Sequence, residues 1–342
     1  MNKSVFILCK QDKVSIEQVS IEHLHICTWS IMSDKFLTEY GFEINRGNLK
    51  KLDLLVVLPA IDSQKGFNCL YKNISDTDNC RFIFNADIKT AEPISGNTDF
   101  GIKFSFYNNR EFTILPIGDN FTLKNKNLQI TLEIPEQAGN IIYVRFLIKS
   151  IEPAFAYIQK GISKKIIHYD VRINECRNTT VDVINAQKHG YKFLSINRCF
   201  CFHIIPSTYN IDFINNNNLK TVRGLESINF NNYLKKLKQE EKINLKDYEY
   251  NIVFCKQEKK EKYSFFSVYS KEYIGNSQIT LALVVNILCN LLFAAGGLHK
   301  KVGDFSLSYW KRIPVEYWIA LGSLVLLVCI PFLFHFIKNH KR

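Results

Sequence analysis

The chain has 342 residues, a formal net charge of +12 and 46% hydrophobic residues. This length allows one large domain or two small ones with a real hydrophobic core. The positive charge suits an anionic membrane surface better than nucleic acid, because no RGG, zinc-finger or RNA-recognition signature accompanies it.

Short strands are expected over most of residues 1–150. Residues 21–29 alternate between two faces with a period of two, which indicates a half-buried strand. Residues 31–40, followed by Gly41, are predicted to form a short helix. Asn108-Asn109 and the loop 135–140 are predicted to close two hairpins. The other expected strands are residues 4–8, 54–58, 81–84, 101–107, 111–115, 121–123, 128–134 and 141–148.

A change in sequence character after Pro153 divides off residues 151–274, as a second domain or as a continuation of the first. A helix is expected over 226–241, and residues 191–205 are expected to form a strand or a strand pair. The other expected elements are strands at 164–173, 250–255 and 264–269, of which the last two form a pair. Many short strands at about ten-residue spacing favour a sandwich or barrel. We therefore expect an α+β fold class with a β-rich soluble region.

Two long apolar segments follow this region. Residues 279–298 contain no ionisable residue, and residues 315–337 contain only Glu316 and His335. A helix rises about 1.5 Å per residue, so about 20 apolar residues cross the hydrocarbon core of a bilayer. The sequence therefore predicts two transmembrane helices that form a C-terminal hairpin. Buried core helices are the alternative, which the absence of a polar stripe disfavours.

The distribution of Lys and Arg near the segment ends predicts the orientation of the hairpin. The apolar run 5–9 is too short for a signal peptide and points to the same orientation. We expect both termini in the cytoplasm, the hairpin in the inner or plasma membrane, and the cysteines as reduced thiols. The outer flanks hold Lys259, Lys260, Lys262, Lys271, Lys338, Lys341 and Arg342, against Lys300, Lys301, Lys311 and Arg312 in the loop.

The first apolar segment contains two carboxamides. Asn286 and Asn290 are four residues apart and share one helical face, and Gly296 and Gly297 follow. Carboxamides in hydrocarbon seek partners on another helix. The partner is either the second helix of the same hairpin or another copy of the chain. The second alternative predicts a homo-oligomer and, when several hairpins assemble, the lining of a pore.

Two expected strands carry His and Cys at alternate positions. Alternate residues project from the same face of a strand, so each strand offers three soft ligands together. If the strands were neighbours, a zinc site or a Cys–His nucleophilic pair could form. The spacing is unlike zinc knuckles, so cysteines packed as small apolar groups are the favoured interpretation. The six residues are His23, His25, Cys27, Cys199, Cys201 and His203.

The densest polar cluster is the face formed by His168, Asp170 and Arg172, continued by Glu175 and Arg177. Arginine forks match phosphate, so this cluster could bind an anionic ligand such as a small nucleotide. A solvated strand face with ion pairs is the favoured alternative. No Walker A, dinucleotide, serine-elbow or HExxH pattern occurs in the sequence. We therefore expect no enzymatic activity and no cofactor.

The layout, a β-rich region followed by the apolar segments 279–298 and 315–337, resembles bacterial membrane effectors of anti-phage, abortive-infection systems. The resemblance covers the order of the parts and no motif, so it assigns no site residue. It implies a cytoplasmic sensor domain, triggered by a co-encoded protein or a small nucleotide signal, and hairpins that self-associate and perturb the lipid bilayer. Two other classes stay open: a passive membrane-anchored adaptor, and a membrane-bound enzyme that uses Asp170 and Glu175.

Overall fold

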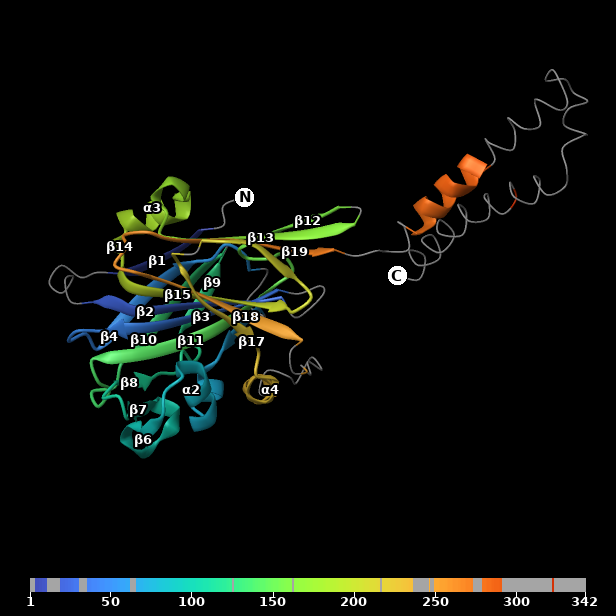
Figure 1. Ribbon diagram of the computed structural model, residues 1–342. Helices are drawn as coiled ribbons and strands as arrows, with labels where there is room; N and C mark the ends of the chain where they lie inside the picture. Colours follow the sequence, from blue (N-terminus) through green and yellow to red (C-terminus); the bar gives the residue numbers. More distant parts are fainter. Residues whose placement is uncertain are drawn as a thin grey trace, which may run out of the picture. The chain divides into compact units, whose positions relative to one another are not determined.

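The computed structural model describes residues 4–10, 19–30, 36–61, 66–124, 126–161, 163–215, 217–235, 246, 249–272, 279–290 and 322. The chain divides into two compact units, Met1–Gln159 with Ile166–Lys271, and Lys160–Lys165 with Glu272–Arg342. The first unit is rich in strands and has few helices (Figure 1). The expectation of a β-rich region is therefore confirmed.

The described strands form two sheets. Sheet 1 runs, in spatial order, through β16 (Asn210–Ile214), β19 (Tyr263–Glu272), β13 (Lys164–Ile173), β1 (Ser4–Lys10), β4 (Lys51–Val57), β10 (Asn127–Glu133) and β9 (Phe121–Lys124), with β12 (Ala156–Lys160) paired to β13 and β14 (Tyr191–Phe193) paired to β1. Sheet 2 runs through β17 (Leu219–Gly224), β18 (Tyr250–Glu258), β15 (Ser195–Pro206), β2 (Ser20–Trp29), β3 (Phe36–Asn45), β11 (Ile141–Ser150), β8 (Glu111–Ile114), β7 (Ile102–Phe106) and β6 (Ile88–Pro93), with β5 (Phe67–Cys69) paired to β11.

The largest hydrophobic core lies between the sheets. Val5 and Ile7 of β1 pack in the same buried cluster as Leu24 and Ile26 of β2. Successive side chains of a strand point to opposite faces, so the period-two alternation in the sequence sends one set of residues into this core. Because both sheets contribute inward-facing side chains, the unit is a sandwich.

The described helices cover parts of the outer faces of the sandwich (Figure 1). On sheet 2, α1 (Tyr71–Ile74), α2 (Thr77–Phe84) and α4 (Ser227–Lys235) enclose a second apolar cluster. On sheet 1, α3 (Val181–Lys188) and β14 cover the outward side chains of β1 and β4. Short 3-10 turns lie at Ile94–Gly96, Thr98–Phe100 and Cys176–Asn178.

Two expected elements have the wrong type. Residues 36–40, expected in a helix, belong to β3, because this strand pairs with both β2 and β11 and tertiary pairing overrides local preference. Residues 81–84, expected in a strand, belong to α2. The Asp76 side chain accepts hydrogen bonds from the backbone N–H groups of Asp78 and Asn79 and so begins that helix.

One of the expected hairpins is confirmed and two are wrong. The turn at Asn108-Asn109 joins β7 to β8, with Asn109 at φ 62°. Residues 135–140 instead connect β10 of sheet 1 to β11 of sheet 2. The expected strand pair 250–255 and 264–269 is likewise split between the sheets, as β18 and β19. Alternation of polar and apolar residues predicts a strand but not the strand that pairs with it. That pairing depends on how the two sheets pack.

Strands from 1–150 and 151–274 pair with each other in both sheets. β1 lies parallel to β13, and β2 lies parallel to β15. Most of both parts, Met1–Gln159 and Ile166–Lys271, therefore lies in one compact unit.

The second unit contains a helix at 279–290 (orange in Figure 1). Across the ranges that the structure describes, no helix combines the length and the apolar character needed to cross a membrane. The predicted membrane segments continue through residues 291–298 and 315–337, which apart from residue 322 lie outside the described ranges.

Candidate functional site

The helix at 279–290 has no charged side chain and is exposed over most of its surface, with Thr280, Val284 and Ile287 half-buried along one side. Large apolar side chains normally lie inside a core, and a helix that is apolar on all sides is normally buried. Here, by contrast, five large apolar side chains are about half exposed. They are Ile279 at 50%, Leu281 at 55%, Leu283 at 46%, Val285 at 51% and Leu288 at 44%.

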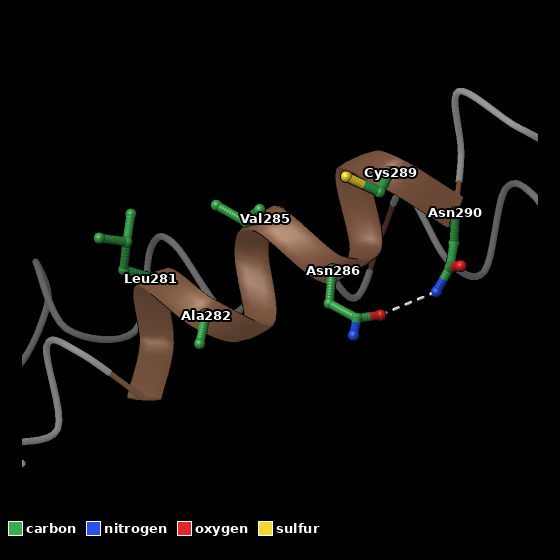
Figure 2. Close-up of a pocket in the computed structure, with 6 residues that line it drawn as sticks. All are labelled: Leu281, Ala282, Val285, Asn286, Cys289 and Asn290. Carbon is green, nitrogen blue, oxygen red and sulfur yellow. Dashed lines mark hydrogen bonds between the residues drawn. The ribbon is translucent and has the colours of Figure 1, made fainter.

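Asn286 and Asn290 lie on one face of this helix, as their spacing predicts (Figure 2). The Asn290 Nδ2 atom donates a hydrogen bond to Asn286 Oδ1 over 2.9 Å. A carboxamide has two N–H donors and an acceptor oxygen, so this single bond leaves capacity for further partners. A pocket on the same face is lined by Leu281, Ala282, Val285, Asn286, Cys289 and Asn290. Gly296 and Gly297, the other association candidates, lie outside the described ranges.

The two His/Cys strands are neighbours, but their candidate ligands do not meet. β2 and β15 run parallel, with His25 opposite Phe200 and Leu24 opposite Cys199. Residues opposite each other in a ladder share a face, so the two triplets point to opposite faces of sheet 2. The joint zinc site is therefore not formed. Over the described ranges, no group of three or more His, Cys, Asp or Glu residues is placed to hold a metal ion.

The β15 triplet faces the core between the sheets. Burial raises the pKa of the Cys199 and Cys201 thiols and lowers the pKa of His203 to about 3. The His203 Nε2 atom lies 3.4 Å from Cys201 Sγ, and its Nδ1 atom lies 3.1 Å from Thr28 Oγ1. A neutral thiol beside a neutral imidazole is no activated nucleophile, because the reactive species is the thiolate. The two cysteines pack as small core groups, and His203 is buried beside them.

The β2 triplet faces the opposite side, beneath the helices of sheet 2. The His25 Nδ1 atom lies 3.0 Å from the Tyr143 hydroxyl. Burial, together with the positive charge of Arg145, holds the pKa of His25 well below its usual range, so its imidazole is neutral. Cys27 accepts a hydrogen bond from Trp29 Nε1 over 3.1 Å, and burial raises the pKa of its thiol.

A buried ionic group that the sequence did not predict adjoins His25. It consists of His25, Glu39, Tyr143, Arg145 and Tyr233, which we call the buried network. Arg145 Nε donates to Glu39 Oε2 over 2.8 Å, and Arg145 Nη2 donates to the same oxygen. Tyr233 donates its hydroxyl hydrogen to Glu39 Oε1 over 3.1 Å, and Arg145 Nη1 donates to the Tyr143 hydroxyl over 3.0 Å. Both carboxylate oxygens of Glu39 therefore have partners.

Burial sets the electrostatics of the Glu39–Arg145 pair, whose side chains are 1% and 6% exposed. Burial raises the pKa of Glu39, whereas the charge and hydrogen bonds of Arg145 lower it. Burial also opposes the charged form of Arg145, but the Glu39 carboxylate more than offsets this and raises the pKa of Arg145. The two groups stabilise each other as an ion pair in a place from which water is excluded.

Local packing fixes the buried network. Gly41 of β3 leaves room for the Tyr143 hydroxyl, because a Cβ atom at this position would overlap that oxygen. The Asn73 Nδ2 atom donates to the Tyr233 carbonyl over 2.9 Å and so ties α1 to α4. A sequence signal was present for Arg145, which interrupts the apolar run Ile141–Ile148. Nothing in the sequence, however, paired residues 106 positions apart.

A second ionic group lies nearer the surface on the same face. Glu43 accepts a hydrogen bond from Arg110, and its Oε2 atom lies 3.0 Å from His23 Nδ1. Burial opposes ionisation of Glu43, but the hydrogen bond with His23 and the charge of Arg110 bring its pKa below the usual range. The His23 Nε2 atom also lies 3.1 Å from Arg198 Nη1. These contacts join β2, β3 and β15 to the β7–β8 turn.

The polar face around β13 consists of ion pairs. Arg172 binds both oxygens of Asp170, with Nε–Oδ1 at 3.0 Å and Nη2–Oδ2 at 2.5 Å. Arg177 likewise binds Glu175 over 3.1 and 3.2 Å. His168 Nε2 lies 3.4 Å from Gln159 Oε1. An anionic ligand would have to displace these carboxylates, and the ligand-binding role of the cluster stays a prediction.

Comparisons with known proteins assign no family. No family model matches the chain, and no curated protein matches it. Among solved structures, it is similar to an M1 zinc metallopeptidase of Deinococcus radiodurans, with a TM-score of 0.29, 7% identity, and coverage of 75% of this chain and 43% of that one. A second structure of an M1 zinc metallopeptidase from this organism gives a TM-score of 0.28, 8% identity and coverage of 74% and 42%.

A homology model of the full-length AP-3 complex, in an intermediate open conformation, gives a TM-score of 0.19, 7% identity and coverage of 81% of this chain and 54% of the other. The chain thus spans less than half the length of the two metallopeptidase structures. At these TM-scores the likeness carries no argument about the function of this chain.

Proposed function

We propose that the chain is a membrane-anchored protein whose apolar C-terminal segments self-associate in the inner or plasma membrane. The exposed, uncharged helix at 279–290 is the observation that supports this proposal. Its sequence continues without an ionisable residue to residue 298, which gives the length that a bilayer requires. A second apolar segment at 315–337 completes the proposed hairpin, with both termini in the cytoplasm.

Lipid is the environment that best fits this helix. Burying apolar surface is worth about 25 cal/mol per Å², so the half-exposed Leu and Val side chains over most of this helix strongly favour transfer from water. A single protein partner would cover one face of the helix only, whereas hydrocarbon surrounds it. The backbone of a helix satisfies its own hydrogen bonds and therefore tolerates that environment.

The carboxamide pair supports self-association. The hydrogen bond between Asn286 and Asn290 leaves other donors and acceptors of both side chains without a partner in it. In hydrocarbon, those groups find partners only on another helix. Copies of the same segment offer identical groups. In the full proposal the sandwich is the sensor domain of an anti-phage effector, and a trigger that it detects causes the associated hairpins to perturb the membrane.

The test is the double substitution Asn286→Leu/Asn290→Leu in the full chain. Interhelical hydrogen bonds contribute about 0.6–2 kcal/mol each, so losing two should weaken association roughly ten-fold or more. Insertion into membranes should be unchanged or better. Crosslinking in membranes measures the oligomers, and dye release from cells measures the perturbation of the bilayer.

The matched control is Asn286→Gln/Asn290→Gln, which keeps both carboxamides and should keep oligomers. An inserted Leu double variant that remains fully oligomeric and active would refute self-association through these residues and leave the passive adaptor as the better account. Activity that is lost in Asp170→Asn or Glu175→Gln, with oligomers intact, would instead favour the membrane-bound enzyme.

A further inference from the structure

An exposed row of aromatic side chains crosses the outer face of sheet 1. We call Tyr157, His168, Phe266 and Phe213 the aromatic row. They come from β12, β13, β19 and β16, which are neighbours in the sheet, and the first three are labelled in Figure 1. The ring centroids are 6.3 Å apart for Tyr157 and His168, 6.5 Å for His168 and Phe266, and 5.8 Å for Phe266 and Phe213. Each ring therefore lies beside the next.

The aromatic row is open to solvent. Tyr157 is 59% exposed, Phe213 51% and Phe266 43%. Neighbouring strands of the same sheet are covered, since α3 and β14 bury the outward side chains Phe6 and Leu8 of β1. A contiguous exposed apolar surface marks a place where another surface binds.

The short connection between β19 and the helix at 279–290 limits how far the end of β19 can lie from that helix. β19, which carries Phe266, ends at Glu272, and six residues separate it from the helix that begins at Ile279. Seven Cα–Cα steps span at most about 25 Å. When the helix lies in a bilayer, as the proposed function requires, the end of β19 stays within that distance of the membrane.

The charge of the chain also fits a lipid surface. Of the net charge of +12, residues 276–342 carry +5, from seven Lys or Arg against two acidic residues, which leaves +7 for the remainder. Anionic leaflets attract such a domain, and tyrosine rings such as that of Tyr157 favour the headgroup layer.

We propose that the aromatic row docks the sandwich onto the lipid headgroup layer of the membrane that anchors the chain. This inference rests on the proposed function, because it needs the helix at 279–290 in the bilayer. The rings enter the headgroup layer while the Asp170–Arg172 pair stays at the edge of the contact, in contact with water. The sandwich is then held against the membrane surface by this face, close to the associating hairpins.

The test uses the full chain in vesicles of phosphatidylcholine and phosphatidylglycerol in which the acyl chains carry bromine. Bromine quenches tryptophan fluorescence only at short range. Phe266→Trp is placed in a background where Trp310 and Trp318 are replaced by Phe. The remaining Trp29 is buried and 2% exposed, so it is protected from the quencher. Phe213→Trp reports the same face from β16 if Phe266→Trp fails to fold.

The matched control is Tyr107→Trp. Tyr107 is an aromatic residue that is 71% exposed at the β7–β8 turn of the other sheet. Docked rings penetrate about 5–10 Å into the headgroup boundary, so emission from position 266 or 213 should be quenched roughly two-fold more than emission from position 107. Flotation of each variant with vesicles measures anchoring separately.

The outcomes separate the two proposals. Variants that float with vesicles and are quenched at 266 or 213, but not at 107, support docking. Floating variants with equal weak quenching at all three positions overturn docking and leave membrane anchoring intact. A chain that does not float with vesicles overturns both. A blue shift at 266 that grows with protein concentration, without quenching, assigns the row to a second copy and also overturns lipid docking.

Discussion

Each outer face of the sandwich carries an acid–arginine ion pair and a histidine, which are buried on one face and accessible to solvent on the other. On sheet 2, helices α1, α2 and α4 cover Glu39, Arg145 and His25. On sheet 1, His168 lies between the exposed rings of Tyr157 and Phe266, and Asp170 and Arg172 form an ion pair on the same strand. The side chains of the covered ion pair are 1% and 6% exposed, against 32% and 41% for the open pair. The same chemistry is thus sealed on one face and presented to solvent on the other.

The difference shows that covering a face changes what its polar groups do. An ion pair in water gains little, because solvent already stabilises both charges. A buried pair depends on its partner, since a charge left alone in a dry interior is very costly. Charge pairs on the covered face therefore matter more for stability than those on the open face.

Removing one charge from each pair should give the largest contrast. Arg145→Met leaves Glu39 buried without its partner and should destabilise the fold by about 3–5 kcal/mol. Arg172→Met on the open face should cost less than about 1 kcal/mol. Urea denaturation of the two variants beside the parent chain measures both effects. Equal losses in the two variants would contradict the contrast between the faces.

A smaller effect is expected from Gly41→Ala. The new Cβ overlaps the Tyr143 hydroxyl, which holds hydrogen bonds with Arg145 and His25. Overpacking of this kind costs about 1–3 kcal/mol. The change in thermal unfolding checks the value, and Tyr143→Phe in the same chain should recover part of the loss by removing the oxygen. Additive losses in the double variant would show that Gly41 does not act through Tyr143.

The smallest effect is the dependence of stability on pH. The folded-state pKa of His25 lies well below its ordinary value of 6.5, so the unfolded chain binds this proton more readily. The contribution of neutral His25 to the free energy of unfolding is therefore fully present above pH 6.5. It is lost as the pH falls, by about 1.4 kcal/mol per pH unit. His25→Gln should therefore flatten the slope of unfolding free energy between pH 6.5 and 5.5.

The matched control for replacing a histidine by glutamine is His168→Gln on the open face, where the imidazole is partly exposed. Identical slopes in His25→Gln and the parent would mean that the covered face admits the proton without loss of stability.

Much of the strand content could be predicted from local pattern. Residues 164–173 alternate, and the structure has β13 at Lys164–Ile173, because one face of a half-buried strand must be apolar. The order of strands could not be predicted in this way. The loop 135–140 resembles a hairpin turn, yet it carries the chain from one sheet to the other. Pairing depends on contacts that are distant in sequence and form only when the sheets pack.

The sequence by itself determined the face that each side chain of a strand shares with its neighbours, and it placed Asn286 and Asn290 on one helical face. Those results follow from the fixed periods of strand and helix. Only the tertiary structure decided that β2 and β15, although adjacent, present His25 and Cys201 to opposite faces. It also brought together Glu39 and Arg145, 106 residues apart. Register and burial arise from the packing of the whole unit, and no local period specifies them.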